Sequence, residues 1–347
     1  MKIFTSSTHK ALLDEAKCYL VNLQNNTIER TIECDSEILN GIFSQNNEYI
    51  VLTTVLKAIE VFQIVSGQKM ASLKMEKKCS ALITRENKGI EYVIVGDKVG
   101  DIVAFDLPTL SKKTFLVGHC ATVITDLTFV GDYLASSDRD EKIFVCKFPQ
   151  TFNIQSICVG HKQFVSCICS VGTHLLSGSA DGTIRIWEVE SGKCLYQWFL
   201  DEVLNIESEE ETILIPHQLF SYSATICMAI VEDNPKLIVL DTANFEKSFC
   251  YTFDSIPVSI TRENNKVIIM TQNLRFYEVQ NVKDSIVVTE QESSLSSQLQ
   301  ANHYVYKKST DEEESGELFK RTVKNRLTTS MGLEKQFEHN KKHKKCE

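Results

Sequence analysis

Short apolar runs recur along the chain at a nearly constant spacing, and the clearest repeat lies near its centre. Residues 133–146 and 174–187 align without a gap, and a Gly-His pair precedes each of them, at Gly118-His119 and Gly160-His161. The two copies lie 41 to 42 residues apart. Each copy has two apolar, partly alternating runs around a polar turn, which predicts a β-hairpin rather than a helix.

The second copy shows how such a hairpin is built. Asp181-Gly182 separates its two apolar runs, and glycine tolerates the positive φ that a tight turn requires. A period of this length, with Gly-His near its start and Trp followed by an acid near its end, is typical of one blade of a WD-repeat β-propeller. The sequence therefore predicts an all-β protein made of repeated blades.

Resemblance to WD-repeat proteins implies a buried hydrogen-bonded set in each central copy. The set in the second copy comprises His161, Ser177, Asp181 and Trp187. Its counterparts in the first copy, by the gapless alignment, are His119, Ser136 and Asp140. Histidine, serine and aspartate could also form a catalytic triad, but their place in a repeated pattern favours a structural role, which requires every member to be hydrogen-bonded.

The same spacing identifies further strands on both sides of the central pair. It gives seven candidate third strands, at Val21, Phe62, Phe105, Cys146, Trp187, Leu240 and Tyr277. The longest step contains an acidic stretch, 205–211, which we interpret as a surface loop. The sequence thus predicts a seven-bladed propeller over residues 1–290. Its ring must close, since an open edge strand invites aggregation. Either residues 2–5 open the first blade, or they complete the last blade with residues 285–289.

Composition limits the classes of function. The chain has 347 residues, a net charge of −9 and 12 cysteines. The cysteines show no Cys-x-x-Cys spacing, which argues against a zinc site, and their positions in apolar runs suit a reducing compartment. We see no signal peptide and no apolar run long enough to span a membrane. We therefore expect no metal, no other cofactor and no membrane partner.

The C-terminal region differs from the rest of the chain. Residues 291–317 are polar and acidic and are predicted to form a linker. Residues 318–347 carry nine Lys or Arg against three acids. The apolar spacing at the start of this segment predicts a short amphipathic helix with a basic opposite face, followed by a basic tail. The basic residues of this segment that could contact a polyanion are Lys320, Arg321, Lys324 and Arg326. The alternative is a solvated, disordered tail.

The turn of the first central copy departs from an ordinary blade. It consists of five consecutive charged residues, Asp138 to Lys142, and Glu141 stands where the second copy has Gly182. If this position has a positive φ, a residue other than glycine costs about 1 kcal/mol there. Local rules are often broken where function requires it, so the turn is either a functional site or a solvated loop.

Two segments resemble the non-catalytic WD-repeat subunit of tRNA (guanine-N(7)-)-methyltransferase. The first is Ala-Ser-Ser-Asp-Arg-Asp-Glu-Lys-Ile at 135–143, and the second contains Gly-His-x-x-Phe-Val-Ser at 160–166. The chain departs from the family at Phe144, where a basic residue is common. The resemblance is strong over 135–166 and weak elsewhere, where the spacing of the seven blades is compatible with it.

The resemblance implies that the two segments form one edge that binds the catalytic methyltransferase subunit. The residues expected to make charged contacts with this partner are Asp138, Arg139, Glu141 and Lys142. Phe164 and Val165 are expected to supply apolar burial. Asp140 is assigned to the hydrogen bonds of its own blade, because it aligns with Asp181.

The sequence favours a scaffold over an enzyme. It contains no Gly-rich loop after a strand that could hold S-adenosylmethionine, and no Gly-x-Ser-x-Gly or His-Glu-x-x-His motif. We expect a non-catalytic subunit that binds and stabilises the catalytic subunit as a heterodimer and meets tRNA through that complex, in the nucleus or also in the cytoplasm. The alternative is a general WD-repeat adaptor, such as a substrate adaptor of a ubiquitin ligase or a ribosome-assembly factor.

Overall fold

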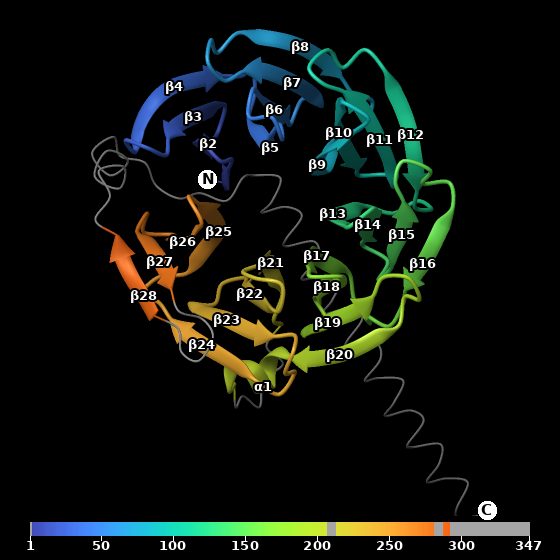
Figure 1. Ribbon diagram of the computed structural model, residues 1–347, viewed down its shortest axis with the longest axis vertical. Helices are drawn as coiled ribbons and strands as arrows, with labels where there is room; N and C mark the ends of the chain where they lie inside the picture. The colour runs from blue at the N-terminus through green and yellow to red at the C-terminus, as the bar shows by residue number, and fades with distance from the viewer. Residues whose placement is uncertain (1, 207–212, 281–286, 292–347) are drawn as a thin grey trace, which may run out of the picture. The chain divides into compact units, whose positions relative to one another are not determined.

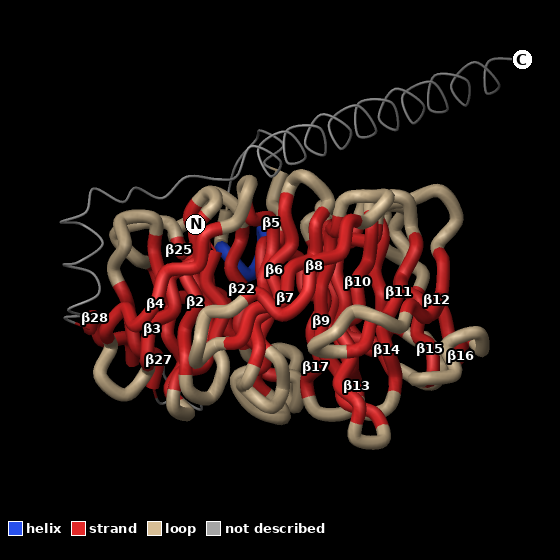
Figure 2. Tube along the Cα trace, turned by 90° about the horizontal axis from the view of Figure 1, so that it is seen from above, coloured by secondary structure: helices blue, strands red, loops and turns tan. Residues whose placement is uncertain are grey.

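A computed structural model describes residues 2–206, 213–280 and 287–291. These residues form seven four-stranded antiparallel sheets, arranged as the blades of a β-propeller around a central axis (Figure 1). In the side view, the turns and connections gather on the two faces of the ring (Figure 2). The prediction of an all-β, seven-bladed fold is confirmed.

The blades follow one another in chain order, each with four consecutive strands. Blades 1 to 4 are β1 (Lys2–Thr5), β2 (His9–Asp14), β3 (Lys17–Asn22), β4 (Thr27–Glu33); β5 (Ile38–Phe43), β6 (Tyr49–Thr54), β7 (Ala58–Gln63), β8 (Lys69–Lys74); β9 (Cys79–Asn87), β10 (Ile90–Asp97), β11 (Asp101–Asp106), β12 (Lys113–Gly118); and β13 (Ile124–Val130), β14 (Tyr133–Asp138), β15 (Ile143–Lys147), β16 (Ile154–Cys158). Blades 5 to 7 are β17 (Val165–Val171), β18 (His174–Ser179), β19 (Thr183–Glu188), β20 (Cys194–Phe199); β21 (Pro216–Ser221), β22 (Ile226–Val231), β23 (Lys236–Asp241), β24 (Ser248–Thr252); and β25 (Pro257–Glu263), β26 (Lys266–Thr271), β27 (Phe276–Gln280), β28 (Val287–Gln291).

The seven predicted third strands coincide with the third strands of the sheets. They are β3, β7, β11, β15, β19, β23 and β27. Their side chains are buried almost throughout, because each sheet is packed between two neighbouring blades. A core cluster between blades 5 and 6 illustrates this, with Leu176 and Ile184 of one blade against Ala229 and Ile238 of the next.

The ring closes between blades 7 and 1 without sharing a strand. Residues 2–5 open the first blade as β1, and β28 completes the last blade. The Ser259 hydroxyl donates to the carbonyl oxygen of Ile3 at 3.3 Å, and Lys10 pairs with Glu263 at 2.7 Å. Closure therefore depends on side-chain packing and polar contacts between two complete blades.

The connection between blades 5 and 6 begins with a helix that the sequence did not predict. α1 (Leu200–Leu204) contacts β20, β23 and β24 and buries Leu200 and Leu204. It ends at Asn205, whose left-handed φ of 51° is one that asparagine tolerates. Most of the predicted acidic loop, at 207–211, lies outside the described residues.

Candidate partner interface at blades 4 and 5

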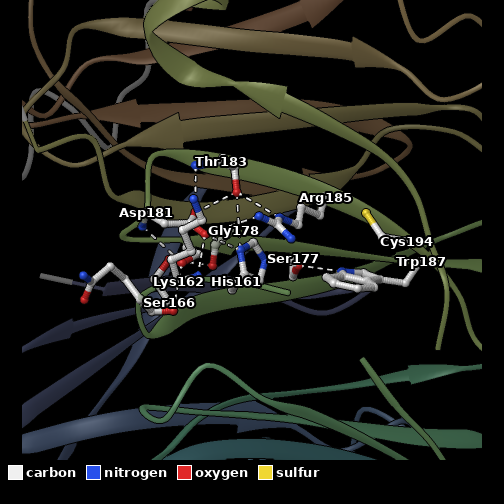
Figure 3. A network of polar contacts seen from close by, with 12 residues as sticks. His161, Lys162, Ser166, Ser177, Gly178, Asp181, Thr183, Arg185, Trp187 and Cys194 are labelled. Carbon is white, nitrogen blue, oxygen red and sulfur yellow. Dashed lines mark hydrogen bonds and ion pairs between the residues drawn. The ribbon is translucent and has the colours of Figure 1, made fainter. Parts of the chain in front are cut away.

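Blade 5 contains the hydrogen-bonded set that its sequence suggested (Figure 3). The Trp187 indole N–H donates to the Ser177 hydroxyl at 2.8 Å, and that hydroxyl lies 2.7 Å from Nε2 of His161. Nδ1 of His161 lies 3.0 Å from a carboxylate oxygen of Asp181. The chain of contacts runs from the buried third strand to the turn before it, so it fixes the turn on the blade.

The protonation of this set follows from its burial. Desolvation lowers the pKa of His161 and outweighs the opposing effect of Asp181, so the ring is neutral near pH 7. Burial alone would raise the pKa of Asp181, but hydrogen bonds from His161, Thr183 and the Lys162 amide lower it to about 2. A neutral imidazole that donates from Nδ1 and accepts at Nε2 satisfies all of these contacts. The polar groups of this set are thus satisfied by hydrogen bonds within the blade.

Blade 4 forms the equivalent set with a different acid. Nδ1 of His119 lies 2.8 Å from Asp138, and Nε2 lies 2.8 Å from the hydroxyl of Ser136. The assignment of this role to Asp140 was therefore wrong. Asp138 ends β14 with only 2% of its surface exposed, whereas Asp140 lies in the turn and is half-buried. Asp138 is a structural residue of the blade and does not belong to an exposed binding surface.

The same carboxylate organises the charged turn. The second oxygen of Asp138 accepts hydrogen bonds from the backbone N–H of Asp140, at 2.8 Å, and of Lys142, at 3.0 Å. Between these amides Glu141 has a φ of 74°, close to the 76° of Gly182. The turn therefore keeps the shape of a glycine turn with a charged side chain at its strained position, as the alignment predicted.

The prediction that Phe164 and Val165 supply apolar contacts to the partner is also wrong. Phe164 is 6% exposed and Val165 is fully buried. Val165 begins β17 and packs with Ile143 and Trp187 in the core between blades 4 and 5. The carbonyl of Phe164 accepts the N–H of Ala180 at 3.1 Å. Both side chains lie inside the propeller, so neither can supply an exposed apolar surface.

The charged side chains of the turn remain at the surface. Lys142 is exposed, and Arg139 and Glu141 are half-buried. Ile143, directly after the turn, packs with Val165 of β17, which places the turn beside the next blade. The exposed Lys162, which sequence reasoning missed, belongs to the same junction and donates its backbone N–H to Asp181 at 2.9 Å. In the sequence, Lys162 could have been identified by its position directly after His161.

Phe144 has a structural reason to depart from the family pattern. Its ring stacks on His119, with centroids 4.0 Å apart and an interplanar angle of 20°. The equivalent position in blade 5 is Arg185, which bonds the Thr183 hydroxyl through Nε at 3.3 Å. The aromatic ring covers the histidine of a blade that has Cys146 in place of the usual tryptophan.

Other expected features fall outside this site. Lys320, Arg321, Lys324 and Arg326 lie outside the described residues, so their contact with tRNA stays a prediction. Within the part of the chain that the structure describes, no group of three or more His, Cys, Asp or Glu could hold a metal ion. None of the helices in that part is long and apolar enough to span a membrane.

Comparison with known families identifies the chain. A family model described as the tRNA methyltransferase TRM82 WD40 domain matches residues 108–310, more than half of the chain. The chain belongs to this family. The matched region includes both motif segments and the whole junction of blades 4 and 5.

Curated relatives carry one name. A protein of Dictyostelium discoideum is 29% identical over 295 residues, covering 72% of this chain and 61% of the relative. A protein of Homo sapiens is 30% identical over 211 residues, covering 58% of this chain and 50% of the relative. Both are named as the tRNA (guanine-N(7)-)-methyltransferase non-catalytic subunit. The chain thus spans about half to three fifths of the length of these two relatives.

Solved structures support the fold alone. The β-propeller domain of Myceliophteria thermophila Cps50 (Swd1) matches with a TM-score of 0.63 at 10% identity, covering 78% of this chain and 95% of that one. The computationally designed Ika8 protein matches with a TM-score of 0.65 at 16% identity, covering 84% and 86%.

Proposed function

We propose that this chain is the non-catalytic subunit of a tRNA (guanine-N(7)-)-methyltransferase and binds the catalytic subunit through the charged turn of blade 4. The residues that would contact the partner are Arg139, Glu141 and Lys142, with Lys162 from the neighbouring blade. The names of the relatives imply that the partner is a separate catalytic subunit. Methyl transfer to tRNA would take place on that subunit.

The proposal rests on one observation: the Asp138 carboxylate holds the backbone of the turn in place through its hydrogen bonds. A single carboxylate bonds His119 of the blade and two amides of the turn, so the charged side chains project from a fixed backbone. A preorganised surface loses little conformational freedom when a partner binds. Glu141 keeps a φ of 74°, so the turn has the backbone shape of a glycine turn but carries a charged side chain at that position.

Charges on such a surface mainly determine which partner binds and in which register. The turn and the neighbouring Lys162 carry charges of both signs. The basic residues are Arg139, Lys142 and Lys162, and Glu141 is acidic. A partner with a complementary arrangement would be selected over one with a single uniform charge. Binding would occur in the nucleus or also in the cytoplasm, and the basic residues from Lys320 to Arg326 would assist tRNA binding by the complex.

The direct test measures methyl transfer and assembly together. The purified chain, tRNA and radiolabelled S-adenosylmethionine are combined with and without the catalytic subunit, and the complex is isolated by size-exclusion chromatography. We expect no incorporation by the chain alone and full incorporation by the pair. Methylation by the highly purified single chain would contradict the proposal. So would a dominant stoichiometric partner in cells that lacks a methyltransferase fold.

A further inference from the structure

The outer strands of the blades differ sharply in what they expose. β4 of blade 1 presents Thr27, Glu29, Thr31 and Glu33 to solvent. β16, at the same place in blade 4, presents Ile154, Gln155 and Ile157, and Val159 follows with 63% of its surface exposed. The exposed positions of β4 are charged or polar, whereas those of β16 are mostly apolar and uncharged.

The apolar surface continues beyond β16 toward blade 3. Phe152, just before the strand, is 77% exposed, and Phe115 on β12 is 59% exposed. The hydroxyl of Thr151 donates to the carbonyl of Leu116 at 2.7 Å, which brings the residues next to these two aromatic rings together. β12 and β16 follow each other along the rim of the ring (Figure 1). We call Phe115, Phe152, Ile154, Ile157 and Val159 the apolar rim.

An exposed edge strand normally carries features that prevent pairing with another chain. Charged side chains, especially lysine, and proline serve this purpose. β16 contains neither. A bulge, the third device, occurs in the pairing of β16 with β15 and equally in the pairing of β4 with β3, so it does not explain the difference. Contiguous exposed apolar residues of this kind mark a surface that a partner covers.

The pairing register connects the apolar rim to the charged turn. Ile143 is paired with Cys158, so the residues that flank this pair, Lys142 and Val159, lie at the same end of the blade. A stable interface buries about 800 Å² on each partner, which the four side chains around the turn cannot supply alone. Interfaces of this size combine an apolar centre with charged residues at the edge. The rim and the turn together have this composition.

We propose that the apolar rim is the apolar half of the surface that binds the catalytic subunit, continuous with the charged turn. The inference rests on the proposed function for the identity of the partner. It gives to the rim the role that the sequence assigned to Phe164 and Val165, which the fold buries. The occupant is an apolar patch of the catalytic subunit beside its charged contacts to the turn.

Hydrogen–deuterium exchange of the complete chain tests the proposal without any substitution. One edge of β16 faces away from β15, and its backbone amides exchange freely unless a partner covers them. We expect exchange in peptides over 150–160 to slow on addition of the catalytic subunit, together with the peptide over 138–143. The peptide over 27–33, which contains β4, is the internal control and should not change.

A matched pair of variants provides the second test. Ile154→Thr with Ile157→Thr gives β16 the residue that β4 uses at its exposed positions and keeps a β-branched side chain. We expect an unchanged melting temperature and a loss of at least about tenfold in affinity for the catalytic subunit, since two apolar contacts disappear. The control, Thr31→Ser on β4, should keep full affinity.

The outcomes separate this inference from the proposed function. If the unsubstituted chain forms no complex, the proposed function fails. If the complex forms and the turn is protected, but β16 exchanges freely and the threonine variant binds normally, the inference alone is overturned. A concentration-dependent dimer of the free chain that the same variant abolishes, with no protection by the catalytic subunit, would assign the rim to a second copy of this chain and would also overturn it.

Discussion

The turns of blades 4 and 5 solve one structural problem with different residues. In blade 5 the hydroxyl of Ser179 accepts the N–H of Asp181, and Asp181 itself bonds His161 and the N–H of Thr183. In blade 4 one carboxylate, that of Asp138, makes the equivalent contacts to His119 and to two turn amides. The blade 4 turn thereby takes these contacts from Asp138 and not from Asp140. A turn whose fold depends on one residue can vary the others to suit a partner.

The largest effect is expected when the charge of the blade 4 turn is reversed. Lys142→Glu should leave the melting temperature unchanged, because Lys142 is exposed, and should weaken binding of the catalytic subunit by about 2 to 5 kcal/mol, because attraction becomes repulsion. Isothermal titration calorimetry with the catalytic subunit measures this.

The matched control reverses a lysine in another blade. Lys57 lies in the equivalent turn of blade 2 and is exposed, and its φ of 67° is close to that of Glu141 in blade 4. Lys57→Glu should bind the catalytic subunit normally. Equal affinities of the two variants would show that the blade 4 turn is merely a solvated loop.

The fold was accessible from the sequence because the repeat constrains it at every level. One well-formed blade, with Asp181-Gly182 and Trp187, fixed the period, and the period located degenerate third strands such as those of Val21 and Cys146. Ring closure was not accessible. Residues 2–5 and 285–289 both have strand patterns, and only the pairing of β1 with β2 and of β28 with β27 shows that two complete blades meet there.

The second largest effect concerns the acid that holds the blade 4 turn. Asp138→Ala removes the partner of a buried histidine and of two turn amides, so we expect a loss of about 1 to 3 kcal/mol in the free energy of unfolding. Asp140→Ala should change it by less than about 0.5 kcal/mol, as for an ordinary surface substitution. Urea denaturation of both variants measures the difference. A larger loss for Asp140→Ala would restore the assignment made by alignment.

The misassignment of these two acids has a physical origin. Aligning Asp140 with Asp181 assumes that equivalent contacts come from equivalent positions, yet a carboxylate two residues earlier reaches the same histidine nitrogen. The sequence of blade 3 contains a parallel to Asp138 that could have corrected the assignment. Asp97 ends β10 as Asp138 ends β14, and one oxygen of Asp97 accepts from the amides of Val99, Gly100 and Asp101. Two successive blades with aspartate at this place indicate a recurring structural role.

The third effect depends on pH and on the contact between the two compared blades. Asp126 of β13 accepts the N–H of Ile168 of β17 at 2.9 Å, and its burial, opposed by hydrogen bonds from Ile168 and Leu127, raises its pKa to about 6. An acid whose pKa is raised by folding makes the protein less stable as pH rises from about 4 to about 6. Since Asp126 is partly accessible to solvent, we expect a contribution of about 1 kcal/mol.

The variant Asp126→Asn cannot ionise and should lack this contribution. The stability of the unsubstituted chain relative to the variant should therefore fall between pH 4 and pH 7, as measured by urea denaturation at both values. A difference between the two proteins that stays constant over this range would mean that the Asp126 carboxyl keeps an ordinary pKa in the folded chain.

The smallest effect isolates the strained residue of the blade 4 turn. Glu141→Gly relieves a φ of 74° at a cost in unfolded-state entropy, so we expect a net gain of about 0.5 kcal/mol in stability. Gly182→Ala tests the same backbone position in blade 5. No atom beyond the two neighbouring residues lies within 4 Å of the added methyl group, so any loss, expected to be at least about 0.5 kcal/mol, reports backbone strain. If Glu141→Gly stabilises the fold and also weakens binding of the catalytic subunit, the Glu141 side chain is retained for binding despite its strained φ. If it does neither, the charged turn owes nothing to its conformation, and the comparison of the two blades reduces to the acid that each one uses.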